Sequence, residues 1–225
     1  IAIAIASALL SVHQHNIIHK DLNPRNILIN PKTGQVKLID FGIATRLSRE
    51  HQEIRSPDRL DGTLAYMSPE QTGRINRTLD YRTDMYSLGT TLYELLSGAP
   101  PFSATDAMEL LHCHIASEPQ PLHERGVPRA LSDIVAKLMA KVPEERYQSA
   151  LGLKADLQEC RRQLRDRGSI SPFKLGGQDA SHQFEIPQKL YGREGELAAL
   201  LETFTAVSQG GTALLLVSGY SGIGK

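Results

Sequence analysis

The residues best suited to chemistry lie in two short stretches near the start of the chain. Residues 19–26 read HKDLNPRN and residues 40–42 read DFG. Asp21 carries a carboxylate that can accept the proton of an attacking hydroxyl group if a loop holds it in place. Asn26 and Asp40 offer an amide oxygen and a carboxylate, which are ligands that Mg²⁺ accepts. A base beside a magnesium ion suits phosphoryl transfer.

The sequence between Asn26 and Asp40 predicts a β-hairpin that brings these two residues together. It contains the apolar, β-branched runs NILIN and VKLID, separated by the turn sequence PKTG. Antiparallel pairing about this turn sets Asn26 roughly opposite Ile39, so Asn26 and Asp40 are expected at the same open end, within about 5 Å. Any one of these polar residues alone would be read as an ordinary turn residue. The three together, in this order and spacing, favour a catalytic site.

These motifs resemble the C-terminal lobe of a serine/threonine protein kinase, whose pattern is H-R-D-x-x-x-x-N, then D-F-G, then A-P-E. The third motif reads SPE at residues 68–70. The resemblance covers residues 1–165. It implies that Asp21 is the catalytic base, that Asn26 and Asp40 bind Mg²⁺, and that ATP donates its γ-phosphoryl group to a hydroxyl of a protein substrate.

Further motifs extend the resemblance and imply supporting roles. Residues 62–67 read GTLAYM, similar to a substrate-docking loop, and residues 84–89 read DMYSLG, similar to the start of the central buried helix. PPF at residues 100–102 and PEERY at residues 143–147 follow in the expected order. The implicated residues are Gly62 and Thr63 in the docking loop, His19, Lys20, Asn23 and Asp84 as supports of the catalytic loop, and Glu70 with Arg146 as an ion pair.

Two positions depart from the kinase pattern. Lys20 stands where most of the family has arginine, and an ammonium group cannot make the planar, bidentate contact with a phosphorylated loop that a guanidinium makes. Asn23 stands where serine/threonine kinases usually carry a lysine that neutralises the transferring phosphoryl group. Loss of that cation is expected to lower transition-state stabilisation.

The chain is expected to be a fragment of a larger protein, cut at both ends. It begins inside a predicted helix with apolar residues at helical spacing, and no Gly-rich loop, strand lysine or partner glutamate precedes the catalytic loop. The ATP-clamping lobe is therefore expected to be missing, and the fragment alone is predicted to be inactive.

The other end of the chain suggests a second nucleotide site. Residues 212–218 read as a buried strand and run into GYSGIGK, which fits the P-loop pattern as far as its lysine. Residues 190–197, LYGREGEL, resemble the entry to signalling P-loop ATPases, as in large bacterial (cyanobacterial-type) multidomain kinases. A plain glycine-rich turn is the alternative. The implicated P-loop residues are Gly219, Gly222, Gly224 and Lys225.

Composition limits the class of protein. The chain has 225 residues, 40% of them hydrophobic, with 25 basic and 25 acidic residues and a formal net charge of zero. This balance gives no electrostatic case for nucleic acid or anionic membrane, and no apolar run approaches the roughly 18 residues that span a bilayer. Two cysteines far apart in sequence fit a reducing compartment, so a cytoplasmic location is expected.

The fold is expected to be mainly α-helical: a kinase-like C-terminal lobe with a small catalytic-loop hairpin, then a linker and the first helix and strand of an α/β P-loop domain. Apolar periodicity predicts helices over residues 83–97, 105–116, 132–141 and 148–165, the first being the most buried. The predicted division is residues 1–165 for the lobe, 166–188 for the linker and 189–225 for the start of the P-loop domain. Cys160 is expected in the core, and His13 near the end of the first helix.

Three functions remain open from the sequence. The first is a working serine/threonine kinase in an intact parent protein, whose other domains would be intramolecular partners. The second is a pseudokinase that binds partners or nucleotide without transfer, which Lys20 and Asn23 suggest. The third is nucleotide-switched assembly through the P-loop.

Overall fold

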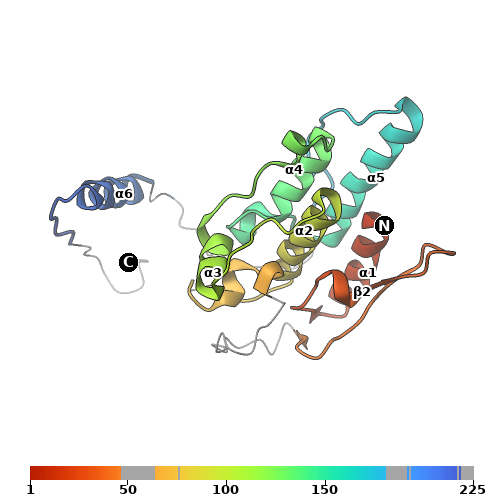
Figure 1. Cartoon of the computed structure of the whole chain (residues 1–225), viewed down its shortest axis with the longest axis horizontal. Coiled ribbons are helices and arrows are strands. Elements are labelled where there is room, and N and C mark those ends of the chain that lie inside the picture. Colours follow the sequence, from red (N-terminus) through yellow and green to blue (C-terminus); the bar gives the residue numbers. More distant parts are fainter. Residues whose placement is uncertain (47–63, 76, 181–191, 193, 217, 219–225) are drawn as a thin grey trace. The chain divides into compact units, whose positions relative to one another are not determined.

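The computed structural model describes residues 1–46, 64–75, 77–180, 192, 194–216 and 218 (Figure 1). The chain divides into two units, Ile1–Phe184 and Glu185–Lys225. Gly62 and Thr63 of the predicted docking loop lie outside the described residues, as do Gly219, Gly222, Gly224 and Lys225 of the predicted P-loop.

The first unit is mainly helical, and its helices lie close to the predicted ranges. The largest shift is at α4, predicted from residue 132, which begins at Arg129 directly after Pro128. Pro128 is the N-cap residue, and its ψ of 135° lies outside the helical range, so the helix begins at the next residue, earlier than the apolar pattern suggested. The helices are α1 (Ala2–Gln14), α2 (Arg82–Ser97), α3 (Ala107–Ala116), α4 (Arg129–Leu138) and α5 (Ala150–Arg167).

Helix α2 runs through the middle of the unit (Figure 1). Eleven of its sixteen residues are buried, so the prediction that it is the most buried helix is confirmed. It ends at Gly98, whose φ of 80° is in the left-handed region that glycine adopts without strain. The predicted apolar stripe stops before this end, because Leu95 and Leu96 are 53% and 41% exposed.

The core forms where α1, α2, α4 and α5 pack together. Leu9 of α1, Leu88 of α2, Leu138 of α4 and Leu153 of α5 are completely buried in one cluster. Cys160 joins this cluster at 3% exposure, as predicted, and burial raises the pKa of its thiol to about 11. The core therefore supports α2 from several sides, and α2 in turn carries residues that reach the candidate site.

Two short antiparallel ribbons flank the candidate catalytic segments. Strands β2 (Ile27–Ile29) and β3 (Val36–Leu38) form the predicted hairpin, with Ile27 opposite Leu38. Strands β1 (Ile17–Ile18) and β4 (Thr45–Arg46) form a second ribbon that the sequence did not predict. Because the catalytic loop follows β1 and the DFG segment follows β3, the two ribbons hold the two segments side by side.

Residues 170–179, called the strap below, lie in the predicted linker but pack back onto α5. The backbone N–H of Ser171 donates to Oε1 of Gln163 (2.9 Å), and that of Gly176 donates to Oδ2 of Asp156 (2.7 Å). The side chains of Ile170, Phe173 and Leu175 pack against the core. The strap contains no helix or strand, as expected for a linker. Its apolar side chains nevertheless pack it onto the first unit.

The second unit contains α6 (Glu194–Ser208), which matches the helix predicted at the start of the P-loop domain. Residues 212–218 were predicted as a buried strand, but the described residues 212–216 form no strand, and Leu214 and Leu216 are 96% and 87% exposed. A strand requires a hydrogen-bonded neighbour, and no described residue pairs with this segment. The α/β P-loop domain is thus not formed by the described residues.

Candidate active site

The carboxylate of Asp21 is held by two side-chain amides from its own loop. Nδ2 of Asn23 donates to Oδ1 of Asp21 (2.9 Å), and Nδ2 of Asn26 donates to Oδ2 (3.0 Å). The same two amides also donate to the backbone oxygen of Asp21, at 3.2 and 2.8 Å. With one amide on each oxygen, the carboxylate cannot rotate without breaking a hydrogen bond. Its orientation is therefore set before any substrate arrives.

The short 3-10 helix Pro24–Asn26 explains why this loop is rigid. Asn23 is its N-cap, and Oδ1 of Asn23 accepts a hydrogen bond from the backbone N–H of Arg25 (3.0 Å). Pro24 fixes the first helical φ without losing a hydrogen bond, since that N–H has no partner in a helix. One asparagine thus caps the helix with its oxygen and holds Asp21 with its nitrogen.

Asp40 lies at the same end of the hairpin as Asn26. The backbone N–H of Ile39 donates to the backbone oxygen of Asn26 (3.0 Å), which continues the β2–β3 ladder by one step. The predicted opposition of Asn26 and Ile39 is thereby observed. Asp40 itself is exposed, so its carboxylate is open to a ligand.

The backbone around Asp40 is unusual. Its φ of 61° is in the left-handed region, where a residue other than glycine costs about 1–3 kcal/mol and aspartate is among the best tolerated. Oδ1 of Asp40 accepts from the N–H of Gly42 (3.3 Å), and a Cβ at Gly42 would stand 3.1 Å from that oxygen. Glycine therefore lets the segment fold tightly around the Asp40 carboxylate.

His19 joins the catalytic loop to the DFG segment. It is fully buried, its Nδ1 accepts from the backbone N–H of Asp21 (3.3 Å), and its Nε2 contacts the backbone oxygen of Ile39 (3.0 Å). Because a carbonyl oxygen only accepts, Nε2 carries the proton and donates it. The ring also packs against Phe41, with ring centroids 4.6 Å apart. His19 thus connects the residues next to Asp21 with those next to Asp40.

Asp84, the third residue of α2, braces the catalytic loop from beneath. It is completely buried; its Oδ1 accepts from the N–H of Lys20 (2.8 Å) and its Oδ2 from the N–H of His19 (2.9 Å). Lys20 has a φ of 68°, a strained value for lysine. Two hydrogen bonds to a buried carboxylate are strong enough to offset such strain.

His13 is a further member of this arrangement. It lies in the last turn of α1, as predicted, and its Nε2 also contacts Oδ2 of Asp84 (2.9 Å). No local pattern indicates this contact, because His13 and Asp84 are 71 residues apart. Gln71 was also missed: its Nε2 donates to the backbone oxygen of Lys20 (2.8 Å) and ties the SPE segment to the loop.

Glu70 and Arg146 form a buried, bidentate ion pair, with N–O distances of 2.6 and 2.9 Å. Their side chains are 1% and 0% exposed. Oε1 of Glu70 also accepts from the hydroxyl of Thr83 (3.0 Å). Burial by itself raises the pKa of Glu70, but the charge and hydrogen bonds of Arg146 outweigh it and hold that pKa below its usual range.

The two departures from the kinase pattern have different surroundings. Lys20 is buried, at 8% exposure, and its backbone N–H and carbonyl are bonded to Asp84 and Gln71. Asn23 contributes a neutral amide to Asp21, where a lysine would bring a positive charge. The structure therefore shows what Asn23 does for the carboxylate, namely to orient it.

Comparison with known proteins agrees with this geometry. A family model described as protein kinase domain matches residues 1–157. The chain belongs to the protein kinase domain family. Its match ends within α5, so the strap and everything after it lie beyond the matched part.

Three relatives show where related sequences occur. The chain is 40% identical over 185 residues to "Hybrid signal transduction histidine kinase G" of Dictyostelium discoideum, covering 72% of this chain and 5% of that protein. It is 42% identical over 147 residues to "Serine/threonine-protein kinase PknB" of Mycolicibacterium smegmatis, covering 64% and 23%. It is 35% identical over 196 residues to "Probable serine/threonine-protein kinase CE0033" of Corynebacterium efficiens, covering 84% and 29%. The chain thus spans less than a third of each of these relatives.

Within the part of the chain that the structure describes, none of the helices combines the length and apolar character needed to cross a bilayer.

Proposed function

We propose that this chain supplies the catalytic half of a serine/threonine protein kinase. Asp21 would accept the proton of a substrate hydroxyl while the γ-phosphoryl group of ATP passes to that oxygen. The observation that carries the proposal is the Asp21 carboxylate, fixed by Asn23 and Asn26 on a loop that Asp84 braces. A base that is already oriented is what proton transfer at a fixed reaction centre requires.

Asn26 and Asp40 would hold Mg²⁺. The Asn26 amide turns its nitrogen toward Asp21, which leaves its oxygen for a cation, and Asp40 is exposed at the same end of the hairpin. Magnesium usually takes only one or two protein ligands and completes its shell with water and phosphate oxygens. Two oxygen ligands beside the base therefore suit a metal that bridges ATP phosphates.

The decisive experiment is phosphoryl transfer from labelled ATP by the full-length protein that contains these residues. Asp21→Asn should lower the rate by about 10²- to 10⁴-fold, the usual contribution of a general base. Asp40→Asn should lower the transfer rate most at limiting Mg²⁺, and excess Mg²⁺ should partly restore that rate. The matched control is Asp133→Asn, the same chemical change at an exposed surface ion pair. Equal labelling by the wild type and Asp21→Asn would rule out the proposed base.

The role of Asn23 has its own test. A neutral amide leaves the charge of the transferring phosphoryl group uncompensated at this position. Asn23→Lys should therefore raise the transfer rate if the lysine Nζ reaches the phosphate. It should lower the rate if losing the hydrogen bond from the amide to Asp21 costs more than the added charge contributes. Measuring kcat for both Asn23→Lys and Asn23→Ala separates these two effects, since only the first variant adds a charge.

A second candidate function is binding without transfer. The observation that favours it is that the side chain of residue 23 beside Asp21 is a neutral amide and not a cation. A protein of this kind would bind Mg²⁺–ATP or a protein partner and show no labelling above Asp21→Asn. A fluorescent ATP analogue, titrated with and without Mg²⁺, distinguishes binding from catalysis.

The wider context is also a proposal. The relative named hybrid signal transduction histidine kinase supports a place in a multidomain signalling protein. A P-loop at Gly219, Gly222, Gly224 and Lys225 rests on the sequence motif and predicts ATP binding that Lys225→Ala abolishes in a longer chain. We further propose a cytoplasmic protein with a lobe at residues 1–165, a linker at 166–188 and a second domain from 189. The 225 residues alone should show no autophosphorylation, and detectable autophosphorylation would overturn this.

A further inference from the structure

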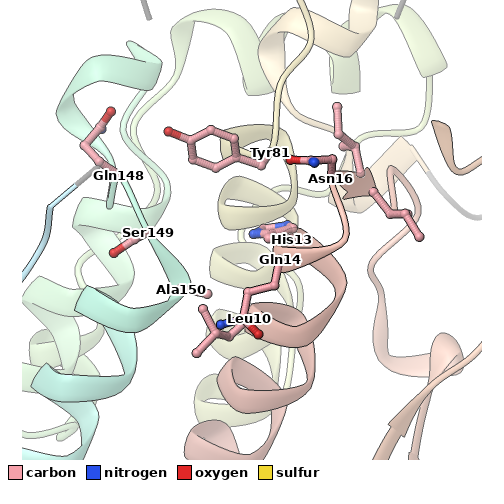
Figure 2. A pocket seen from close by; sticks show the side chains of 10 residues that line it. Leu10, His13, Gln14, Asn16, Tyr81, Gln148, Ser149 and Ala150 are labelled. Carbon is pink, nitrogen blue, oxygen red and sulfur yellow. The ribbon is translucent and has the colours of Figure 1, made fainter. Parts of the chain in front are cut away.

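A cavity of about 370 Å³ lies beside the strand that leads into the catalytic loop. It is bounded by the end of α1, the start of α2 and the start of α5 (Figure 2). Figure 2 shows Leu10 and His13 of α1 opposite Ser149 and Ala150 at the start of α5. Its volume falls at the lower end of the range of about 300–1,000 Å³ found for small-molecule sites.

The lining of the cavity is mainly apolar. Leu10, Ile17, Ala150 and the ring of Tyr81 form apolar walls, and side-chain amides and a hydroxyl are interspersed among them. None of the described residues that line it is a lysine, arginine, aspartate or glutamate. An ionised ligand would lose its hydration without gaining a counter-charge, so the lining selects neutral molecules.

His13 lines this cavity and has one unused hydrogen-bonding atom. Its side chain is 10% exposed, and its Nδ1 is buried with no hydrogen-bond partner among the described residues. Its Nε2 contacts Oδ2 of Asp84, which only accepts, so Nε2 carries a proton, and in the neutral form of the ring Nδ1 is an acceptor. A buried acceptor without a donor is unfavourable, and a ligand that brings a donor would remove that penalty.

The α5 wall of the cavity is held in place from the strap. The carboxylate of Asp179 accepts from the backbone N–H of Gln148 and from the hydroxyl of Ser149, both at 2.8 Å. Ser149 in turn caps α5 by accepting from the N–H of Gly152 (2.9 Å). These bonds fix the first turn of α5, so this wall of the cavity is already ordered, which lowers the entropy cost of binding.

We propose that this cavity binds a neutral, mostly apolar small molecule that donates one hydrogen bond to Nδ1 of His13, and that the catalytic loop senses its binding. Nδ1 is itself buried, so the donor reaches it after a small movement of the surrounding side chains. A donor on Nδ1 polarises the ring and strengthens the Nε2–H bond to Asp84. Oδ2 of Asp84 also accepts from the backbone N–H of His19. A stronger bond from His13 to Oδ2 therefore changes the hydrogen bond between Asp84 and His19 in the catalytic loop.

The proposal is independent of phosphoryl transfer, and NMR titration of the 225-residue chain tests it directly. The probe is 1-naphthol, which is neutral, apolar and carries one O–H donor; 1-methoxynaphthalene is its matched control without the donor. 1-Naphthol should give saturable shifts of the His13 Nδ1 resonance and of the backbone N–H of His19 and Lys20. 1-Methoxynaphthalene should bind about tenfold more weakly, the usual effect of losing one hydrogen bond to a buried acceptor.

Two variants locate the site. Leu10→Trp fills the cavity from its half-buried rim and should abolish 1-naphthol binding. Leu151→Trp, the same change on the exposed face of α5, should leave it unchanged. The probe pair on the wild type keeps the test valid if Leu10→Trp fails to fold. No saturable shift with 1-naphthol, equal affinity for both probes, or binding that survives in folded Leu10→Trp would each overturn the proposal; the first result would leave water as the occupant.

Discussion

Replacing Glu70 with glutamine should show how strongly the fold depends on its buried ion pair with Arg146. An arginine side chain has five N–H donors, and each finds an acceptor here. Nη1 and Nη2 each donate to Glu70, at 2.6 and 2.9 Å. The other three donors reach backbone oxygens of Ala140, Arg82 and Lys141, at 2.8, 3.0 and 3.1 Å.

The expected cost follows from this complete set of bonds. Glutamine has nearly the shape of glutamate, but it places an NH₂ group against a guanidinium N–H, so one charge-assisted bond is lost and two donors face each other. Arg146 then keeps a buried charge with no counter-charge. Breaking a buried pair in this way costs about 3–5 kcal/mol, a large share of the roughly 5–15 kcal/mol that stabilises a typical domain.

The measurement is urea unfolding of the 225-residue chain, followed by circular dichroism at 222 nm. Asp133→Asn is the matched control, because it makes the same acid-to-amide change in a pair whose side chains are 60% and 40% exposed. Its free energy of unfolding should change by less than about 1 kcal/mol. If Glu70→Gln also changed it by less than about 1 kcal/mol, the ion pair would not be a structural anchor, and the reasoning would be refuted.

The same experiment has a pH dependence with a defined sign. The pKa of folded Glu70 lies below its usual 4.5, because Arg146 outweighs the opposing effect of burial. Unfolded glutamate has a pKa of about 4.3. The contribution of the ionised form is therefore complete above this pH and is lost as the pH falls through the folded pKa. The difference between wild type and Glu70→Gln should narrow in acid and stay constant between pH 6 and 8.

Three further predictions concern single positions. Burial and the nearby positive charge of a lysine lower the pKa of His114 to about 4. Since the unfolded pKa is about 6.5, lowering the pH from 6.5 to 4 should reduce the free energy of unfolding by up to about 3 kcal/mol. His114→Gln should remove this pH dependence, as urea unfolding at pH 7 and pH 4.5 can check. Gly89→Ala places a Cβ 2.8 Å from side-chain atoms at the end of α4 and should lower the free energy of unfolding by about 1–3 kcal/mol. Gly195→Ala, where a Cβ meets no atom within 4 Å, is the control and should not lower it, as thermal unfolding can check. Gly152→Ala puts a Cβ 2.4–2.7 Å from atoms of Asp179; it should displace the strap and speed hydrogen exchange at the N–H that donates to Asp179, and unchanged exchange there would contradict the strap's attachment.

Local sequence patterns predicted the helices and the catalytic hairpin because the forces that form them act over a few residues. The spacing of apolar side chains located the helices to within a few residues, and the PKTG turn set the hairpin register that brings Asn26 level with Ile39. Asn23 and Asn26 lie within five residues of Asp21, so their contacts with it follow from one short loop.

The errors arose where a segment's structure depends on distant partners. Residues 212–216 have the composition of a buried strand, yet a strand forms only against a neighbour, and the described residues supply none. Leu95 and Leu96 continue an apolar stripe, but the core ends before them and they stay exposed. The strap has no periodic pattern, and its attachment depends on Asp156 and on the start of α5, which lies far from it in sequence.

The sequence by itself determined the identity and order of the chemical groups: a carboxylate at residue 21, an amide at 26 and a second carboxylate at 40, with the turn that joins the last two. Only the tertiary structure decided how these groups are held. Asp84 reaches the loop across more than 60 residues, and His13 reaches Asp84 across 71. Such contacts depend on where α1 and α2 lie relative to each other, and the core to which both helices contribute decides that placement. A local pattern therefore shows which residues can react, while the core decides which residues position them.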